Sequence, residues 1–353
     1  MADVTNETGG SAARPAHDEA VAPSTPNQRR RRLAATLSLV AGVTIFGAKL
    51  LGWYFSGSTA LLSDALESIV NVLASGFAFF AIRFAEKPAD RDHPYGHGKV
   101  EFLSAAFEGG LVAFAAVLIL YTGVRALIVG VELRQMDVGL VLAAGAALGN
   151  FVLGRYLLRT GEQTGSMTLV ADGHHVLADV WTTAGAFVGL LLARVTGWAW
   201  LDPVAALVIG LMLVRTGARL VKQSVDGLLD REDPKLLERL VRAFDAERVP
   251  GVSGVHRLRA IRSGDLVHVD AHVFVPAHWS VAKAHEAILD LEERVKTHAG
   301  MNGEIALHLD PCNGNECAGC SDVQCLHRRE SWAGPEPLDV DGATGPGRDE
   351  PGR

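Results

Sequence analysis

Apolar residues are concentrated in one half of the chain, and this uneven distribution constrains the fold more than any other feature. Of the 353 residues, 48% are hydrophobic, and most of these lie between Leu33 and about Val221. A helix needs about 20 apolar residues to cross the roughly 30 Å of hydrocarbon in a bilayer. The sequence therefore predicts a membrane half followed by a soluble half, rather than two or three soluble domains.

Six stretches of the apolar half have the length and composition of membrane-spanning helices. They cover residues 33–55, 59–83, 101–129, 136–158, 166–194 and 199–221. Lys and Arg residues gather before the first stretch and after the second, fourth and sixth. Short loops rich in these residues stay in the cytoplasm. We therefore predict a multi-pass protein of the cell membrane with both termini in the cytoplasm.

The two ends of the chain are polar. Residues 1–32 are rich in Ala, Pro, Ser and Gly, lack the apolar segment of a signal peptide, and end in the basic run Arg29–Arg32. We expect a disordered tail here and interpret the basic run as a topology anchor. The net charge of −7 gives no sign of nucleic-acid binding. Residues 312–353 contain four cysteines and then a second tail that we expect to be disordered.

Residues 222–311 predict a small α+β domain. A helical pattern with a proline in its first turn covers 233–247, and two alternating stretches, 254–262 and 265–275, flank a Ser-Gly-Asp turn. A second helix is expected over 279–300 and a last strand over 304–310. The expected fold is thus an all-α transmembrane domain of six helices at 33–221, joined to a cytoplasmic α-β-β-α-β domain.

The fifth apolar stretch contains the sequence ADGHHVLADV, with four ionisable residues. Asp172, His175 and Asp179 have the three- and four-residue spacing that places side chains on one face of a helix, whereas His174 falls off that face. An ionisable residue at the centre of a spanning helix costs roughly 3 kcal/mol on insertion scales. The alternative is an interhelical hydrogen bond or salt bridge, but three groups on one stripe favour a functional site.

The second apolar stretch repeats this pattern with Asp64, Glu67 and Asn71. At 1.5 Å rise per residue, Glu67 should lie level with Asp179 near the middle of the membrane. By the same estimate Asn71 should lie level with His175 of the fifth stretch. Two ligands from each helix would suit a four-coordinate divalent metal of the zinc or iron type.

Three other groups carry metal-ligating residue types. In the loop after the second stretch, Asp90, His93 and His97 are spaced for one metal site, although two ordinary histidines in a solvated loop remain the alternative. The soluble half contains a larger set that has room for two close metals, although surface histidines are common. This set is His256, His272, His285, His308 and Asp310.

All four cysteines lie in one short segment beyond the last expected strand. The cytoplasm is reducing, so disulfides are not expected there, and the alternatives are a thiolate zinc site or unpaired thiols. These cysteines are Cys312, Cys317, Cys320 and Cys325.

Together, these motifs resemble the cation diffusion facilitator family of proton-coupled efflux transporters for divalent metals. The resemblance covers about Leu33 to Cys312 and includes GSTALLSDALESIVN, HPYGHGKVE, ADGHHVLAD, LDPVAAL, LLDRE and the run from GVSGVHRLRAIRSG to HLDPC. It implies a homodimer, formed through a metallochaperone-like cytoplasmic domain. It also implies a salt bridge at the membrane junction between Lys99 and Asp230.

The resemblance assigns roles to the sites described above. It implies a transport site at Glu67, Asn71, His175 and Asp179, to which Asp64 and Asp172 are possible accessories, together with the loop site and the cytoplasmic site. Well-known members have Asp or His and then Asp where this chain has Glu67 and Asn71, which leaves the choice of metal open. No family role is implied for the cysteines.

The expected function is efflux of zinc, iron or a related divalent metal in exchange for protons, without enzymatic activity. Two other classes remain open at this point. A membrane-anchored metal sensor would not explain a polar stripe in mid-membrane. An intramembrane zinc hydrolase would need a motif such as H-E-x-x-H, which the chain lacks.

Overall fold

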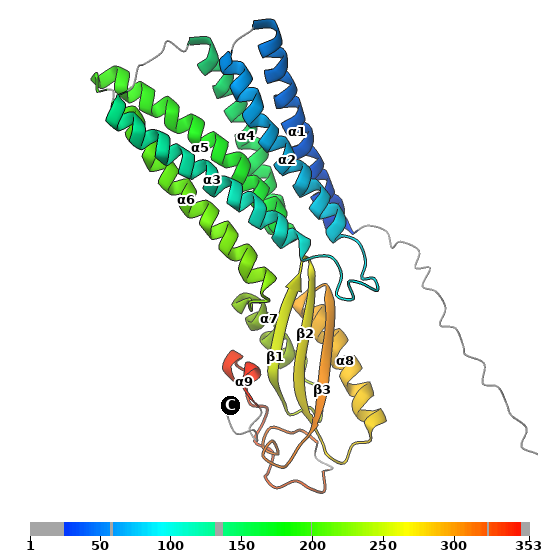
Figure 1. Ribbon diagram of the computed structural model, residues 1–353. Coiled ribbons are helices and arrows are strands. Elements are labelled where there is room, and N and C mark those ends of the chain that lie inside the picture. Colours follow the sequence, from blue (N-terminus) through cyan, green and yellow to red (C-terminus); the bar gives the residue numbers. More distant parts are fainter. Residues whose placement is uncertain (1–24, 57–58, 131–136, 199, 323–324, 347–353) are drawn as a thin grey trace, which may run out of the picture.

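The computed structural model describes residues 25–346, except 57–58, 131–136, 199 and 323–324. A bundle of long helices forms one end of the molecule and a small domain with a single sheet forms the other (Figure 1). The sequence prediction of a helical half followed by an α/β half is therefore confirmed. The helices of the bundle are α1 Pro26–Ser56, α2 Thr59–Ala85, α3 Val100–Val129, α4 Asp137–Thr164, α5 Met167–Thr196 and α6 Leu201–Leu228.

Within the described residues, four of these helices are long and apolar enough to cross a membrane. The four segments are Pro26–Ala48, Ser68–Ala85, Val100–Val129 and Leu201–Leu228. Helices α4 and α5 are of similar length but are not among these four segments. The apolar helices support a membrane protein, while the predicted number of six spans goes beyond what their composition establishes.

The first helix begins earlier than expected. It starts at Pro26, so Arg29–Arg32 belong to α1 and not to a disordered tail. The helix continues through this basic run because Arg31 is almost fully buried, with 2% of its surface exposed, and is paired inside the protein. The prediction that residues up to 32 are disordered is therefore wrong for residues 26–32.

Helices α3 and α6 pack closely because small residues line their contact. A Cβ atom added to Gly217 would lie 2.7 Å from the carbonyl oxygen of Gly109, and one added to Gly109 would lie 2.8 Å from the Cβ of Leu220. Glycines let two helix backbones approach closely in a membrane bundle. This contact fixes the register of α3 against α6, so Gly109 lies level with the turn from Gly217 to Leu220.

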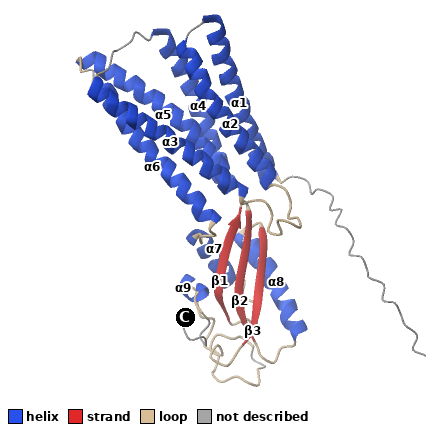
Figure 2. Cartoon of the chain, viewed as in Figure 1, coloured by secondary structure: helices blue, strands red, loops and turns tan. Residues whose placement is uncertain are grey.

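The small domain has the predicted α-β-β-α-β order (Figure 2). Its elements are α7 Pro234–Ala246, β1 Gly254–Ser263, β2 Leu266–Val275, α8 Val281–Ala299 and β3 Gly303–Pro311. Asp233 caps α7 by accepting hydrogen bonds from two backbone N–H groups, and Ser280 caps α8 in the same way with one. The sheet order is β1-β2-β3, with β1 antiparallel and β3 parallel to β2.

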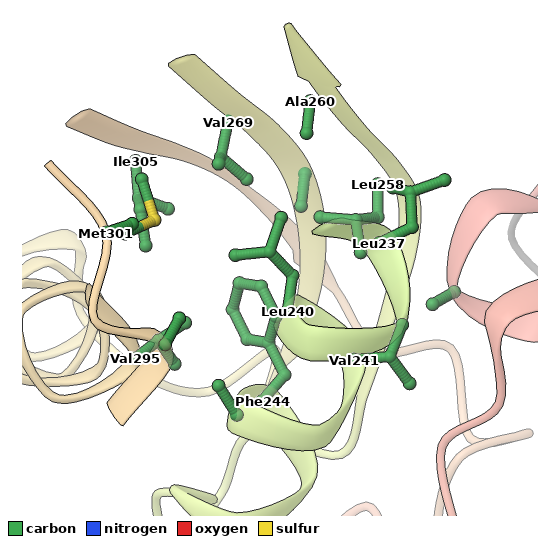
Figure 3. Close-up of a cluster of buried hydrophobic side chains, with 14 of the residues drawn as sticks. Leu237, Leu240, Val241, Phe244, Leu258, Ala260, Val269, Val295, Met301 and Ile305 are labelled. Carbon is green, nitrogen blue, oxygen red and sulfur yellow. The ribbon is translucent and has the colours of Figure 1, made fainter. Parts of the chain in front are cut away.

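Helices α7 and α8 cover one face of this sheet. Leu240 and Phe244 of α7 and Val295 of α8 pack against Val269 of β2 and Ile305 of β3 (Figure 3), and each of these side chains is buried. The sheet alternates, so the residues between the core positions of β2 and β3 point to the opposite face. Polar side chains are therefore collected on the uncovered face of the sheet.

The segment after β3 is packed against the small domain. A short helix, α9 Val340–Thr344, contacts β1, and Ala343 is fully buried in the same core as α7. Leu338 and Val340 pack beside it. The expectation of a disordered tail is therefore wrong for the described residues up to 346, because a few apolar residues in a polar segment find a place in the core.

Acid should loosen this packed segment through Asp245 of α7. Its carboxylate accepts hydrogen bonds from Arg248 Nε at 3.2 Å and from the Leu338 backbone N–H at 3.1 Å. Burial alone would raise the pKa of Asp245, but these bonds and the Arg248 charge outweigh it and lower the pKa. A lowered pKa stabilises the docked state at neutral pH, and this stabilisation disappears as the pH falls below about 4.

Hydrogen exchange of residues 338–345, corrected for the intrinsic effect of pH, measures this loosening. At neutral pH, Asp245→Asn should accelerate exchange in this segment. Asp290→Asn, which removes an exposed carboxylate of α8, is the matched control. Equal exchange in the two variants would contradict the role of Asp245.

Candidate metal sites

A polar cluster joins α2 and α5 inside the helical bundle. The Nε2 atom of His175 lies 3.1 Å from the side-chain oxygen of Asn71, and the amide of Asn71 donates a hydrogen bond of 2.8 Å to Asp179. His175 is buried, with 7% of its surface exposed. The structure therefore brings together three of the four predicted transport-site residues, and Asn71 lies level with His175 as the helix geometry predicts.

Of the other residues predicted for this site, Asp64 and Glu67 have side chains that lie outside the described part of α2. Asp172 is fully buried on α5, one turn from His175 toward the small domain. His174 is off the stripe as predicted, and its ring lies instead within the electrostatic reach of Arg219 and Glu162.

The loop between α2 and α3 brings Asp90, His93 and His97 together. The ligand atoms of all three lie within 4.8 Å of one another. The two carboxylate oxygens of Asp90 lie 3.4 Å from His93 Nδ1 and 3.3 Å from His97 Nε2. The backbone N–H of His93 donates to Asp90 at 2.7 Å, and this bond is the largest cause that lowers the pKa of the carboxyl. The loop therefore holds the carboxylate of Asp90 between the imidazole rings of His93 and His97.

A second convergent group lies on the uncovered face of the small domain's sheet. The carboxylate of Asp310 on β3 lies between two histidines. Its Oδ2 is 3.1 Å from His256 Nε2 and 2.9 Å from His272 Nδ1. His308 lies 2.9 Å from the other oxygen. The strand register explains this arrangement, because His256 is opposite His272 and His272 is opposite His308. The three histidines thus form a row across the sheet.

A β-bulge makes this row possible. In a regular strand His256 and Leu258 would point to the same face, but the pairing of β1 with β2 shifts between His256 and Arg259. Arg257 has a positive φ of 52°, and its N–H donates to the carbonyl oxygen of Gly345 at 2.9 Å. The bulge lets Leu258 enter the core while His256 remains on the uncovered face of the sheet, and the carbonyl oxygen of Gly345, just after α9, holds the bulge in place.

Removing the segment around α9 should therefore weaken metal binding at the small domain. A chain ending at Glu336 loses the acceptor for the Arg257 N–H, which frees the bulge that orients His256. Groups that orient metal ligands without touching the metal typically contribute 10- to 100-fold to affinity, so we expect a loss of about tenfold or more. Titration of the purified protein with zinc, compared with a control chain ending at Pro346, measures this, and equal affinities would contradict it.

His285 and the cysteines do not join these groups. His285 is exposed on α8 and does not belong to the group formed by His256, His272 and Asp310. All four cysteines are free thiols, with Cys317 and Cys320 buried and Cys312 and Cys325 partly exposed. Within the described residues no three of the thiols lie within 4.8 Å of one another.

The predicted salt bridge at the junction of the two halves is present. Lys99 Nζ lies 2.9 Å from a carboxylate oxygen of Asp230, just beyond the end of α6. The two side chains are 41% and 37% exposed in the single chain. The burial that the resemblance implies for this pair is therefore not provided by this chain alone.

A buried ion pair at the same junction was missed by the sequence analysis. Arg31 Nη1 of α1 lies 3.2 Å from Glu101 Oε1 of α3, and each side chain is 2% exposed. Ser166 donates to the other oxygen of Glu101, and Arg31 also donates to the carbonyl oxygen of Thr164. The same guanidinium lies 3.9 Å from Asp265, in the turn between β1 and β2. One arginine therefore links α1, α3, the α4–α5 turn and the small domain.

Comparisons with known proteins agree with this architecture. The family model for the cation efflux transmembrane domain matches residues 35–229, and the model for the cytoplasmic domain of cation efflux proteins matches residues 240–312. An uncharacterized transporter of Synechocystis is 36% identical over 284 residues, which are 80% of this chain and 91% of that protein.

Named relatives include proteins from two other bacteria. The cation-efflux pump FieF of Shewanella oneidensis is 31% identical over 280 residues, which are 79% of this chain and 94% of the relative. The manganese efflux system protein MneS of Bacillus subtilis is 27% identical over 277 residues, which are 78% and 94% of the two chains. These proteins are named as transporters; the name of MneS mentions manganese, whereas the names of the other two mention no particular metal.

The cytoplasmic-domain match indicates dimerisation, and the transmembrane-domain match, together with the apolar helices, indicates a membrane protein. Both halves of the fold are thus accounted for by one family of cation efflux transporters. The chain belongs to the cation diffusion facilitator family of divalent metal cation transporters and is not an enzyme.

Proposed function

We propose that this transporter exports a divalent transition-metal ion from the cytoplasm in exchange for protons, and that it works as a homodimer. The observation that carries the proposal is the cluster of Asn71, His175 and Asp179 between α2 and α5. A polar cluster inside a membrane bundle marks a pathway for ions or protons. Six spanning helices, with both termini in the cytoplasm, complete this proposal.

The chemistry of the cluster supports an exchange of metal for protons. A metal ion binds neutral imidazole and ionised carboxylate, so its binding to His175 and Asp179 releases any protons that these groups hold. Protons that arrive on the outside compete with the metal for the same atoms. Exchange then requires only that the site opens alternately to each side, as in other secondary transporters.

Asn71 gives this site its particular character. Its side chain connects His175 to Asp179, and a bound metal would replace both hydrogen bonds with one bond to the amide oxygen. We propose that Glu67, one turn away on α2, supplies a further carboxylate oxygen, with Asp64 and Asp172 as accessory groups. Nitrogen and oxygen donors suit zinc and iron, and the names of relatives add manganese.

The sites outside the bundle are assigned regulatory or capture roles in this proposal. The loop site at Asp90, His93 and His97 is placed to bind metal before it enters the bundle. Metal at His256, His272, His308 and Asp310, with His285 supplied by a second chain, would tighten the dimer. The link between Lys99 and Asp230 would be shielded at the dimer junction.

Transport by the purified protein in liposomes tests the proposal. Zn, Fe, Mn, Co, Ni and Cd are offered in competition, and a pH-sensitive dye inside the vesicles records proton movement. We expect metal accumulation accompanied by proton flux in the opposite direction. Metal bound to the protein without accumulation would instead indicate a membrane-anchored sensor, and accumulation without proton flux would remove the exchange from the proposal.

A further inference from the structure

The helical bundle contains a second group of buried polar side chains, separate from the cluster at Asn71. Glu108 of α3 and Asp172 of α5 are each fully buried, with 0% of their surface exposed. Neither oxygen of Glu108 has a hydrogen-bond partner, and Asp172 lies within its electrostatic reach. Asp172 itself has the Ser38 hydroxyl of α1 as a hydrogen-bonding neighbour and lies within the electrostatic reach of His175.

Two serines extend this group toward the small domain. Ser104 lies one turn before Glu108 on α3, and Ser224 lies one turn after Leu220 on α6. Both are fully buried, and neither hydroxyl oxygen has a partner. Because Leu220 of α6 packs against Gly109 of α3, Ser224 lies level with the turn that contains Ser104. Three buried polar groups without hydrogen-bond partners, Glu108, Ser104 and Ser224, therefore occur in one part of the bundle.

The two carboxyls lie between two apolar layers. Ala105, Ala171 and Leu220 form a cluster on the side of the small domain, and Val112, Ala178 and Leu213 form another further along the same helices. Neither layer supplies charge. The next titratable groups along α5 are His174, which lies off the polar stripe, and His175, which lies on it, and the basic residues of α6 in this region are exposed. These basic residues are Arg215, Arg219 and Lys222.

Glu101, two turns before Glu108 on the same helix, shows what an ionised buried carboxylate requires. It is equally buried but is paired with Arg31 and accepts a hydrogen bond from Ser166. Glu108 has no such compensation, and Asp172 has only the Ser38 hydroxyl and the nearby ring of His175. An ionised carboxylate that is buried without a partner is so unfavourable that it takes up a proton instead, and two facing carboxyls cannot both ionise.

We propose that Glu108 and its neighbour Asp172 share a proton-binding site that adjoins the metal site at His175, of which Asp172 is also an accessory group. In the conformation described here the pair holds at least one proton. Since Asp172 lies one turn from His175 toward the small domain, the pair lies on the route between the cytoplasmic side and the metal site. This role rests on the proposed exchange of metal for protons, and it assigns part of the proton coupling to Glu108, which is not among the proposed metal ligands.

Infrared spectroscopy of the full-length protein tests the proton-binding site independently of transport. A protonated carboxylic acid has a C=O stretching band separate from that of a carboxylate and from the amide bands. Difference spectra at neutral pH, wild type minus Glu108→Gln and wild type minus Asp172→Asn, should show this band in at least one of the two. Glu162→Gln, which replaces an exposed glutamate of α4, should show none. If neither Glu108→Gln nor Asp172→Asn loses the protonated band, the proposal is overturned.

Folding of the variants provides a second readout. Glutamine has the shape and charge of a protonated glutamic acid, so Glu108→Gln should unfold at the same temperature as the wild type or higher. In liposomes, the same variant should still bind metal at His175, but an imposed pH gradient should accelerate its metal uptake less than in the wild type. If the difference spectra show the protonated band but Glu108→Gln responds to the pH gradient like the wild type, the proton site is not coupled to transport. That result would overturn the assigned role.

If the wild type does not move protons at all, the proposed exchange fails while the infrared result stands on its own. The two proposals can therefore fail separately.

Discussion

Replacing His175 with alanine should abolish metal-dependent proton flux in proteoliposomes. In the proposed site His175 is the nitrogen ligand, and its Nε2 lies 3.1 Å from the side-chain oxygen of Asn71. Loss of a group that only orients a metal ligand typically costs 10- to 100-fold in metal affinity, so removal of a ligand should reduce uptake by about 100-fold or more. Asp179→Ala should have a similar effect, because it removes the carboxylate of α5.

The neighbouring histidine provides a matched control. His174→Ala changes the same residue type one position away, on a side of α5 that faces Arg219 and Glu162 and not the cluster. Its uptake should stay close to that of the wild type. If His175→Ala and Asp179→Ala both keep normal flux, the transport site is not between α2 and α5. If His174→Ala alone is inactive, the orientation of the polar stripe is wrong.

Replacing Arg31 with methionine should cause the largest loss of stability among single substitutions in the bundle. The change leaves the Glu101 carboxylate buried without its cation, and breaking a buried ion pair in this way costs about 3–5 kcal/mol. For a protein of this size class that corresponds to a fall of roughly 10 °C in the unfolding temperature. Thermal unfolding in detergent, followed by tryptophan fluorescence, measures the change.

Two further variants separate the ion pair from other effects of the substitution. Arg30→Met removes an exposed arginine from the adjacent position of α1 and should change the unfolding temperature little. In the double variant Arg31→Met with Glu101→Gln, the orphaned charge is gone, so most of the lost stability should return. A double variant as unstable as Arg31→Met would show that packing of the arginine, and not its charge, stabilises the junction.

Periodic patterns in the sequence predicted the elements that rest on local rules. The α-β-β-α-β order of the small domain was predicted from caps, alternation and a turn, and the structure confirms it. The polar stripe on α5 was predicted from residue spacing alone, and the depth estimate correctly placed Asn71 beside His175. These features depend on helix and strand geometry, which is the same in every protein.

Features that depend on distant contacts could not be predicted in this way. The partner of Arg31 is 70 residues away, so a basic run before an apolar segment was interpreted as an anchor alone. The bulge at Arg257 has no sequence signature in GVHRLRAIR, since it requires the carbonyl oxygen of Gly345 from the far end of the chain. The docked position of α9 depends on a few apolar residues within a polar tail.

Glu108 is a different case, because a signal was present. A single glutamate stands within the apolar stretch FLSAAFEGGLV, and an ionisable residue in a spanning helix indicates a functional site by itself. It was overlooked because Glu101, the nearest ionisable residue on the same helix face, lies two turns away at the edge of the apolar stretch. Its neighbour Asp172 is on another helix, and only the three-dimensional arrangement brings them together.

The linkage at Arg31 also means that the two halves of this transporter are not interchangeable modules. The guanidinium touches Glu101 in the bundle and lies 3.9 Å from Asp265 in the small domain, where Gly98 and Gly264 also pack closely. A chimera that takes the small domain from a relative would have to keep an acidic turn residue and a glycine on both sides of the joint. The boundary between the halves is thus a matched surface, and exchange between relatives would have to cut the chain elsewhere.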